Sequence, residues 1–117
     1  MKEHRMQRIA ELIKREISKI MYSSAEDQRL KRLIITHVNV TPDLKLARIY
    51  VSNPNEKEQT EEYFHALQKA SGFIKSNLAP HLQLRYMPEL EFIYDTSLEK
   101  ACQVIELLNQ IEKKDER

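Results

Sequence analysis

Residues 67–77 read LQKASGFIKSN and contain Gly72, the only glycine in a chain of 117 residues. Glycine in the interior of a helix costs about 1 kcal/mol relative to alanine, so its use here needs a reason. Apolar residues recur at helical spacing on both sides of Gly72 without a change of phase: Tyr63, Leu67, Ala70, Ile74 and Leu78. Gly72 falls away from this stripe, which predicts a helical pair whose bare backbone at Gly72 faces outward.

Two interpretations of Gly72 are open, and they are not exclusive. The start of a second helix would offer unpaired amides to an anion, beside Lys69, Ser76 and, more obliquely, Lys75. Alternatively, the glycine only permits a kink.

Downstream, Pro80 is expected to end this helical stretch, which begins near Glu58, because proline donates no amide and restricts the residue before it. Residues 82–95, LQLRYMPELEFIYD, are expected to be extended, and Pro88 indicates an edge or a bulge early in the strand. Thr96 and Glu99 fit a capping box. It opens a final helix with an apolar face of Leu98, Ala101, Ile105 and Leu108.

Upstream, residues 3–21 are predicted to be a helix with one apolar stripe: Met6, Ile9, Ile13, Ile17 and Ile20. Residues 22–30, YSSAEDQRL, have no period and are expected to be a loop. RLIITHVNV (32–40) and LARIYVS (46–52), joined by TPDLK, predict a hairpin. In its turn Pro42 presets φ and Asp43 is placed to bond nearby backbone amides.

The predicted element order is therefore α-β-β-α-(kink)-α-β-α. The chain has no internal repeat and no low-complexity linker. We expect one α+β domain over residues 1–112, with helices covering one face of a three-stranded sheet, and a frayed tail at 113–117.

Composition fits a globular protein of the cytoplasm. Apolar residues make up 41% and charged residues 32% of the chain, and no apolar run is long enough to span a bilayer. No N-terminal stretch has the pattern of a signal peptide. A single cysteine, Cys102, cannot form an internal disulfide and is expected to be a small core residue.

The sequence carries no motif for catalysis or for a metal or cofactor. His4, His37, His65 and His81 are scattered without metal-ligand spacing, and a chain with one glycine holds no phosphate-binding glycine loop. The carboxylates at positions 56, 58, 61 and 62 are expected to form a solvated face. We therefore expect a protein that is not an enzyme and needs no cofactor.

The charge distribution is more informative than the net charge of +1. Residues 1–24 carry six Lys or Arg against three Glu, and four of these cations fall on one helical arc: Arg5, Arg8, Arg15 and Lys19. Such an arc is suited to following phosphates. The alternative is a solvated face in which Glu11 and Glu16 form local ion pairs.

Taken together, these fragments resemble the bacterial ribosome-binding factor A family. The resemblance rests on RIAELI (8–13), DQRL (27–30), VNVTPDLKLARIYVS (38–52), ALQKASGFIKSNLA (66–79) and LQLRYMPELEFIYDTS (82–97), in this order. It implies a type II KH-like fold in which a helix–kink–helix with an Ala-x-Gly element, here Ala70-Ser71-Gly72, replaces the usual GxxG loop.

The same resemblance implies an assembly factor that binds the small ribosomal subunit and its RNA late in maturation. It further implies a role in processing the 5′ end of that RNA and in growth in the cold, with an assembly GTPase as a candidate second partner. We expect a monomer. The alternative function is a protein-interaction module with no direct RNA contact.

Charge and placement, with the resemblance, give a set of candidate RNA-binding residues. They are Arg5, Arg8, Arg15, Lys19, Lys69, Gly72, Lys75 and Arg85. For Arg85 the alternative is an ion pair with Glu89 or Glu91. Structured RNA would be recognised by its shape and phosphates, because the chain lacks a GxxG loop.

Overall fold

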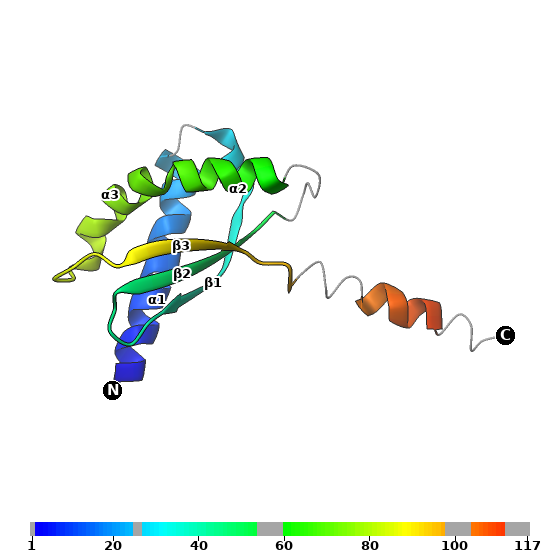
Figure 1. Cartoon of the computed structure of the whole chain (residues 1–117), viewed down its shortest axis with the longest axis horizontal. Coiled ribbons are helices and arrows are strands. Elements are labelled where there is room, and N and C mark those ends of the chain that lie inside the picture. Colours follow the sequence, from blue (N-terminus) through cyan, green and yellow to red (C-terminus); the bar gives the residue numbers. More distant parts are fainter. Residues whose placement is uncertain (1, 25–26, 54–59, 98–103, 112–117) are drawn as a thin grey trace.

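The computed structural model describes residues 2–24, 27–53, 60–97 and 104–111 (Figure 1). A three-stranded sheet has the order β1-β2-β3, with β1 and β2 antiparallel and β2 and β3 parallel. Its strands are β1 (Ile34–Val40), β2 (Leu46–Ser52) and β3 (Glu89–Tyr94), and the long helices are α1 (Lys2–Lys19), α2 (Thr60–Lys69) and α3 (Ser71–Leu82). The mixed α+β class is as predicted. No described helix is both long and apolar enough to cross a membrane.

Helix α1 forms where the apolar stripe predicts it. Ile9, Ile13 and Ile17 are buried at a helical spacing of four residues. After Lys19 the chain continues as one π-helical turn, η1 (Ile20–Ser24), which buries Ile20 and Met21 side by side. The turn extends the contact of this segment with the core.

The prediction of a loop over residues 22–30 is wrong at both ends of the segment, because residues 22–24 belong to η1 and residues 28–30 to a second short helix. Residues Gln28–Arg32 form a 3-10 helix, η2. Asp27 caps it by accepting a hydrogen bond from the Arg29 amide at 3.0 Å, and Leu30 is buried. A single cap and one buried leucine stabilise this turn, and neither gives a periodic pattern.

The hairpin of β1 and β2 is as predicted, including its Pro-Asp turn. The Lys45 amide donates to Asp43 Oδ1 at 3.0 Å, and the Thr41 hydroxyl lies 2.7 Å from the same oxygen. Leu44 adopts the left-handed conformation (φ 61) that glycine usually takes in such turns. The register shifts between Ile35 and His37, which marks a bulge in β1.

Helices α2 and α3 meet at a break, as the stretch around Gly72 predicts. The amide of Ala70 is shared between the carbonyls of Ala66 and Leu67, at 3.0 and 3.1 Å. The carbonyl of Ala70 then accepts from the Ile74 amide at 2.9 Å, which begins α3.

Pro80 does not end the second helix, contrary to expectation. Helix α3 continues to Leu82 and closes at Gln83, which is left-handed (φ 51). A proline this close to the C-terminus removes only one helical hydrogen bond. The burial of Leu78 and Leu82 on both sides of it keeps the last turn in place.

Strand β3 lies at the edge of the sheet, and Pro88 immediately precedes it, consistent with the predicted edge position. Backbone bonds tie both of its ends to the hairpin. The Glu89 amide donates to the Lys45 carbonyl at 2.8 Å, and the Asp95 amide donates to the Val51 carbonyl at 2.7 Å.

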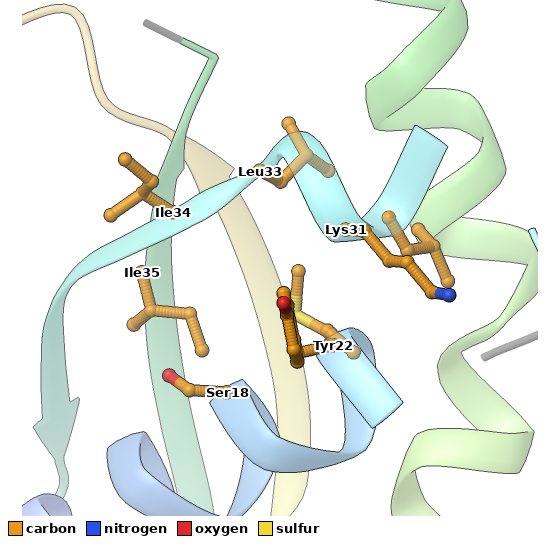
Figure 2. Close-up of a pocket in the computed structure, with 8 residues that line it drawn as sticks. Ser18, Tyr22, Lys31, Leu33, Ile34 and Ile35 are labelled. Atoms are coloured by element: carbon orange, nitrogen blue, oxygen red, sulfur yellow. The ribbon is translucent and has the colours of Figure 1, made fainter. Parts of the chain in front are cut away.

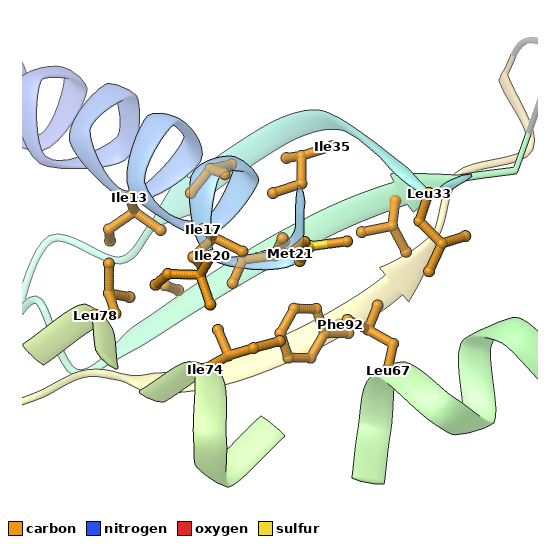
Figure 3. Packing of buried hydrophobic residues seen from close by; sticks show 14 of the residues in the cluster. Ile13, Ile17, Ile20, Met21, Leu33, Ile35, Leu67, Ile74, Leu78 and Phe92 are labelled. Atoms are coloured by element: carbon orange, nitrogen blue, oxygen red, sulfur yellow. The ribbon is translucent and has the colours of Figure 1, made fainter. Parts of the chain in front are cut away.

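The core lies between the sheet and α1, α2 and α3 (Figure 3). Ile13 and Ile17 of α1, Ile74 and Leu78 of α3 and Phe92 of β3 meet there. Each buried aliphatic or aromatic side chain of this kind contributes roughly 1.5–3 kcal/mol relative to an exposed one. The helices therefore cover one face of the sheet, as expected.

The final helix differs from expectation in its packing. Residues 104–111 are helical and lie apart from the sheet in Figure 1. Their large apolar side chains are all 53–58% exposed: Val104, Ile105, Leu107, Leu108 and Ile111. Leu98, Glu99, Ala101 and Cys102 lie outside the described residues. The domain boundary at residue 112 stays a prediction.

Candidate nucleic-acid interface

A groove runs between α1 and the end of α3, and three predicted cations line it. Arg5, Arg8 and Arg15 project from α1, and residues 82–84 form the opposite wall. The groove has a volume of about 550 Å³. Helical spacing places these three guanidinium groups on one side of α1. Because α1 packs against α3, this side of α1 borders the end of α3.

Lys19 joins this set through Glu16. The Glu16 carboxylate lies 3.8 Å from Arg15 Nε and 3.7 Å from Lys19 Nζ, and its other oxygen lies 3.7 Å from His81 Nδ1. The predicted local pairing therefore exists for Glu16. Arg15 and Lys19 remain about two-thirds exposed, and exposed pairs are worth about 0–1 kcal/mol. Both cations thus stay available to a ligand.

Arg85 belongs to a second groove that shares Arg5 and Leu84 with the first. It is lined also by Lys45 of the hairpin and by Tyr86 and has a volume of about 440 Å³. The alternative expected for Arg85 is wrong, because Glu89 pairs with Lys75 at 2.9 Å and Glu91 with Arg48 at 3.6 Å. The Arg85 guanidinium instead lies 5.5 Å from the centre of the Tyr86 ring.

The remaining predicted residues lie at the break between α2 and α3. Lys69 ends α2, and Gly72 is the second residue of α3. Gly72 is exposed as predicted, and a Cβ at this position would meet nothing within 4 Å. Its φ is not positive, so neither crowding nor backbone conformation requires glycine here. None of Lys69, Gly72 and Lys75 lines the two grooves.

The sequence analysis missed Lys45 and Tyr86 as members of the surface. Tyr86 follows Arg85 directly in LRYMPEL, so an aromatic residue beside a cation in a loop was the available signal. Lys45 reaches the groove only because the hairpin turn lies against the loop between α3 and β3. No local pattern reveals that contact.

A third groove, at the end of α1, has a different character (Figure 2). Leu33, Ile34 and Ile35 are among its lining residues together with the exposed Tyr22, and Lys31 is the one cation among them. No candidate residue of the sequence analysis lies there.

Three carboxylates among the described residues have lowered pKa values, and each has a local cause. A hydrogen bond from Arg29 lowers the pKa of Asp27, one from Thr41 lowers that of Asp43, and one from Thr36 lowers that of Asp95. No group of three or more His, Cys, Asp or Glu side chains suited to a metal occurs in the part of the chain that the structure describes.

The order α1-β1-β2-α2-α3-β3, with β3 parallel to β2 and a helical break in place of a glycine loop, defines the class of KH-like domains. A family model described as ribosome-binding factor A matches residues 5–108. The chain belongs to this family.

Individual relatives and a solved structure of the same family are also similar to this chain. Ribosome-binding factor A of Acetivibrio thermocellus is 43% identical over 107 residues, which cover 91% of this chain and 87% of the relative. The factor of Thermomicrobium roseum is 42% identical over 117 residues, 100% of this chain and 91% of the relative. The crystal structure of the Thermus thermophilus factor is similar with a TM-score of 0.66 at 26% identity, over 76% of this chain and 94% of that one.

A homology model of the Thermus thermophilus factor has been fitted into a cryo-EM map of its complex with the 30S subunit. It matches with a TM-score of 0.58 at 27% identity and covers 73% of this chain and 89% of that one.

Proposed function

We propose that this chain is a ribosome assembly factor that binds the small ribosomal subunit through its RNA. The observation that carries the proposal is the convergence of Arg5, Arg8 and Arg15 on one groove, with their charges exposed. Family membership supports it, as does the 30S complex of the Thermus thermophilus factor.

The finer function extends this binding to late maturation of the particle. The chain holds an immature conformation of the small-subunit RNA, or excludes a competing one, until the 5′ end has been processed by another enzyme. This role matters most in the cold. We place the chain in the cytoplasm as a monomer, with an assembly GTPase as a candidate release partner.

The chemistry of the surface fits recognition of RNA shape. Guanidinium groups bind phosphates bidentately, and three of them along one helix face suit the spacing of a phosphate backbone rather than a base edge. Lys69 and Lys75 flank the break at Gly72 and extend the proposed contact surface along α3. Arg85 extends it toward the hairpin.

Co-sedimentation with purified small subunits tests the proposal. The chain should pellet with free small subunits and not with complete ribosomes. Replacing Arg8, Arg15 and Lys19 together with Glu should lower affinity for the particle by more than ten-fold, about 1.4 kcal/mol. The fold should persist, because all three side chains are exposed.

A matched variant controls for net charge. Lys14, Lys31 and Arg48 lie outside both basic grooves, and their replacement with Glu changes the total charge by the same amount. This control should retain most of the affinity. Equal loss in both variants would show that only bulk charge matters and would refute the assigned surface.

A further inference from the structure

The loop between α3 and β3 carries an unusually exposed aromatic residue. Tyr86 is 74% exposed, whereas Tyr63 of α2 is 4% exposed. An exposed tyrosine ring contributes little to the stability of the fold, because aromatic side chains stabilise a fold mainly when their rings are buried. The surroundings of Tyr86 indicate what the ring is suited to bind.

Three cations line the same groove as this ring. The Arg85 guanidinium lies over it at 5.5 Å, and Arg5 and Lys45 line the same groove. Within the described part of the chain none of these three side chains has a carboxylate within salt-bridge distance, although Asp43 interacts electrostatically with Lys45. All three side chains are exposed, so an anionic ligand can reach them.

The two carboxylates that line the groove are both engaged. Asp43 accepts hydrogen bonds from the Thr41 hydroxyl at 2.7 Å and the Lys45 amide at 3.0 Å. Glu89 pairs with Lys75 at 2.9 Å. Three cations against two carboxylates leave the groove with a net positive charge.

The rest of the lining is apolar. Leu44, Leu84 and Met87 complete it, and each is partly buried against the core. An exposed ring, an apolar floor and free cations at the rim are what an unpaired nucleotide requires: stacking for the base and charge for its phosphates. A volume of about 440 Å³ is within the range of small-ligand sites.

We propose that this groove, formed by Arg5, Lys45, Arg85 and Tyr86, holds an unpaired nucleotide of the bound RNA. The base stacks on the Tyr86 ring, and the three cations contact the flanking phosphates. The inference rests on the proposed RNA binding and deepens it, because it adds a subsite for single-stranded RNA beside the groove of Arg5, Arg8 and Arg15.

Tyr22 provides a matched control. It is 72% exposed, but its groove is lined mainly by apolar side chains and by a single cation, Lys31 (Figure 2). The two tyrosines therefore share exposure and differ in electrostatic surroundings.

The experiment measures the affinity of the full chain for three fluorescent RNA probes by anisotropy. The probes are a ten-nucleotide oligoadenylate, the same strand with one abasic position in each pair of nucleotides, and a ten-base-pair duplex. Tyr86→Leu should weaken binding to the intact single strand by about ten-fold or more. Tyr86→Phe should bind like the wild type, and so should Tyr22→Leu. The duplex should not distinguish the variants.

Stacking and charge are separated by the abasic probe. The gap in affinity between wild type and Tyr86→Leu should shrink on it, because half of its bases are gone. An equal loss on both single strands, or none on the intact strand, would overturn the proposal. Unchanged RNA affinity with lost co-sedimentation would also overturn it, and would assign Tyr86 to a protein of the particle.

The proposed function and the nucleotide subsite can be refuted independently of each other. If the wild-type chain does not co-sediment with small subunits, RNA-dependent assembly activity is refuted whatever Tyr86 does. If co-sedimentation persists while Tyr86→Leu binds every probe normally, only the nucleotide subsite is refuted.

Discussion

At Gly72 the structure has open space where any other residue would place its Cβ. The backbone there is helical and φ is not positive, so an alanine side chain fits without strain. This leaves the outward-facing backbone at the break as the feature that glycine preserves. The two interpretations of the sequence, a kink and a binding surface, now make different predictions.

Gly72→Ala should raise the free energy of unfolding by up to about 1 kcal/mol, because alanine loses less backbone entropy in a helix. If the bare backbone contacts RNA, the same variant should weaken binding to small subunits. Urea unfolding followed by circular dichroism measures the first effect, and co-sedimentation measures the second. A clear loss of stability would contradict the geometry of the break.

Asp95 makes a second prediction at this scale. Its carboxylate accepts hydrogen bonds from the Thr36 hydroxyl of β1 and the Ser97 amide, and these bonds lower its pKa below the usual 3.8. A carboxylate whose pKa is lower in the folded state stabilises the fold above its unfolded pKa and loses this effect as pH falls through the folded value.

Asp95→Asn should therefore reduce stability near neutral pH and flatten the loss of stability below about pH 4. Urea midpoints of wild type and variant measured across that range should converge in acid. Asp27 and Asp43 have shifts of the same sign and are unchanged in both proteins, so they cancel in the comparison. Parallel curves would show that the Thr36–Asp95 contact contributes nothing.

Among the elements, α1 has two roles: its apolar stripe fills the core and its outer arc supplies the guanidinium groups of the first groove. The C-terminal helix at 104–111 also carries large apolar side chains, but these are exposed and pack against no other described residues. Ile17 is 0% and Ile105 57% exposed. Substituting each isoleucine therefore compares the stability contribution of a helix packed on the core with that of a helix whose apolar side chains are exposed.

Ile17→Ala should lower the free energy of unfolding by roughly 2–5 kcal/mol, because it removes core contacts and leaves a cavity. Ile105→Ala should change it by less than about 0.5 kcal/mol. Thermal unfolding of the two variants provides the comparison. A large effect at Ile105 would mean that the last helix packs on the domain in solution.

The sequence predicts those elements whose residues repeat along the chain. The β-branched runs around Pro42 and Asp43 predicted both hairpin strands, and the stripe from Tyr63 to Leu78 predicted the helical pair. Gly72 itself predicted the break, which lies at Ala70. By contrast, the 3-10 turn depends on the single cap of Asp27, and α3 passes Pro80 because Leu82 is held by the core. The cap is a single local contact, and the burial of Leu82 is long-range packing, so neither leaves a repeating pattern in the sequence.

The same distinction holds for the candidate site. Arg5, Arg8 and Arg15 share a helix, so their common face follows from helical spacing alone. Tyr86 and Lys45 come from separate segments that meet only in the folded chain. Lys75 looked available from the sequence, but Glu89 from β3 lies 2.9 Å from it.

For the whole molecule, the net charge of +1 conceals a basic side. Cations from α1, from the hairpin turn and from the loop before β3 converge around two adjoining grooves, while Glu16, Asp43 and Glu89 are each in contact with cations or hydrogen-bond donors. The distribution of charge, rather than its sum, is therefore what suits the chain to RNA.

The central claim is that Arg8 and Arg15 bind phosphates of the small-subunit RNA. It is tested most directly by the salt dependence of binding to purified small subunits. The logarithm of the affinity should fall linearly with the logarithm of salt concentration, by about 0.7–0.9 per phosphate neutralised. Arg8→Gln with Arg15→Gln should reduce that slope by about 1.4–1.8, and Lys14→Gln with Lys31→Gln should leave it unchanged. A slope that is nearly flat in the wild type, or the same in both double variants, would contradict the account.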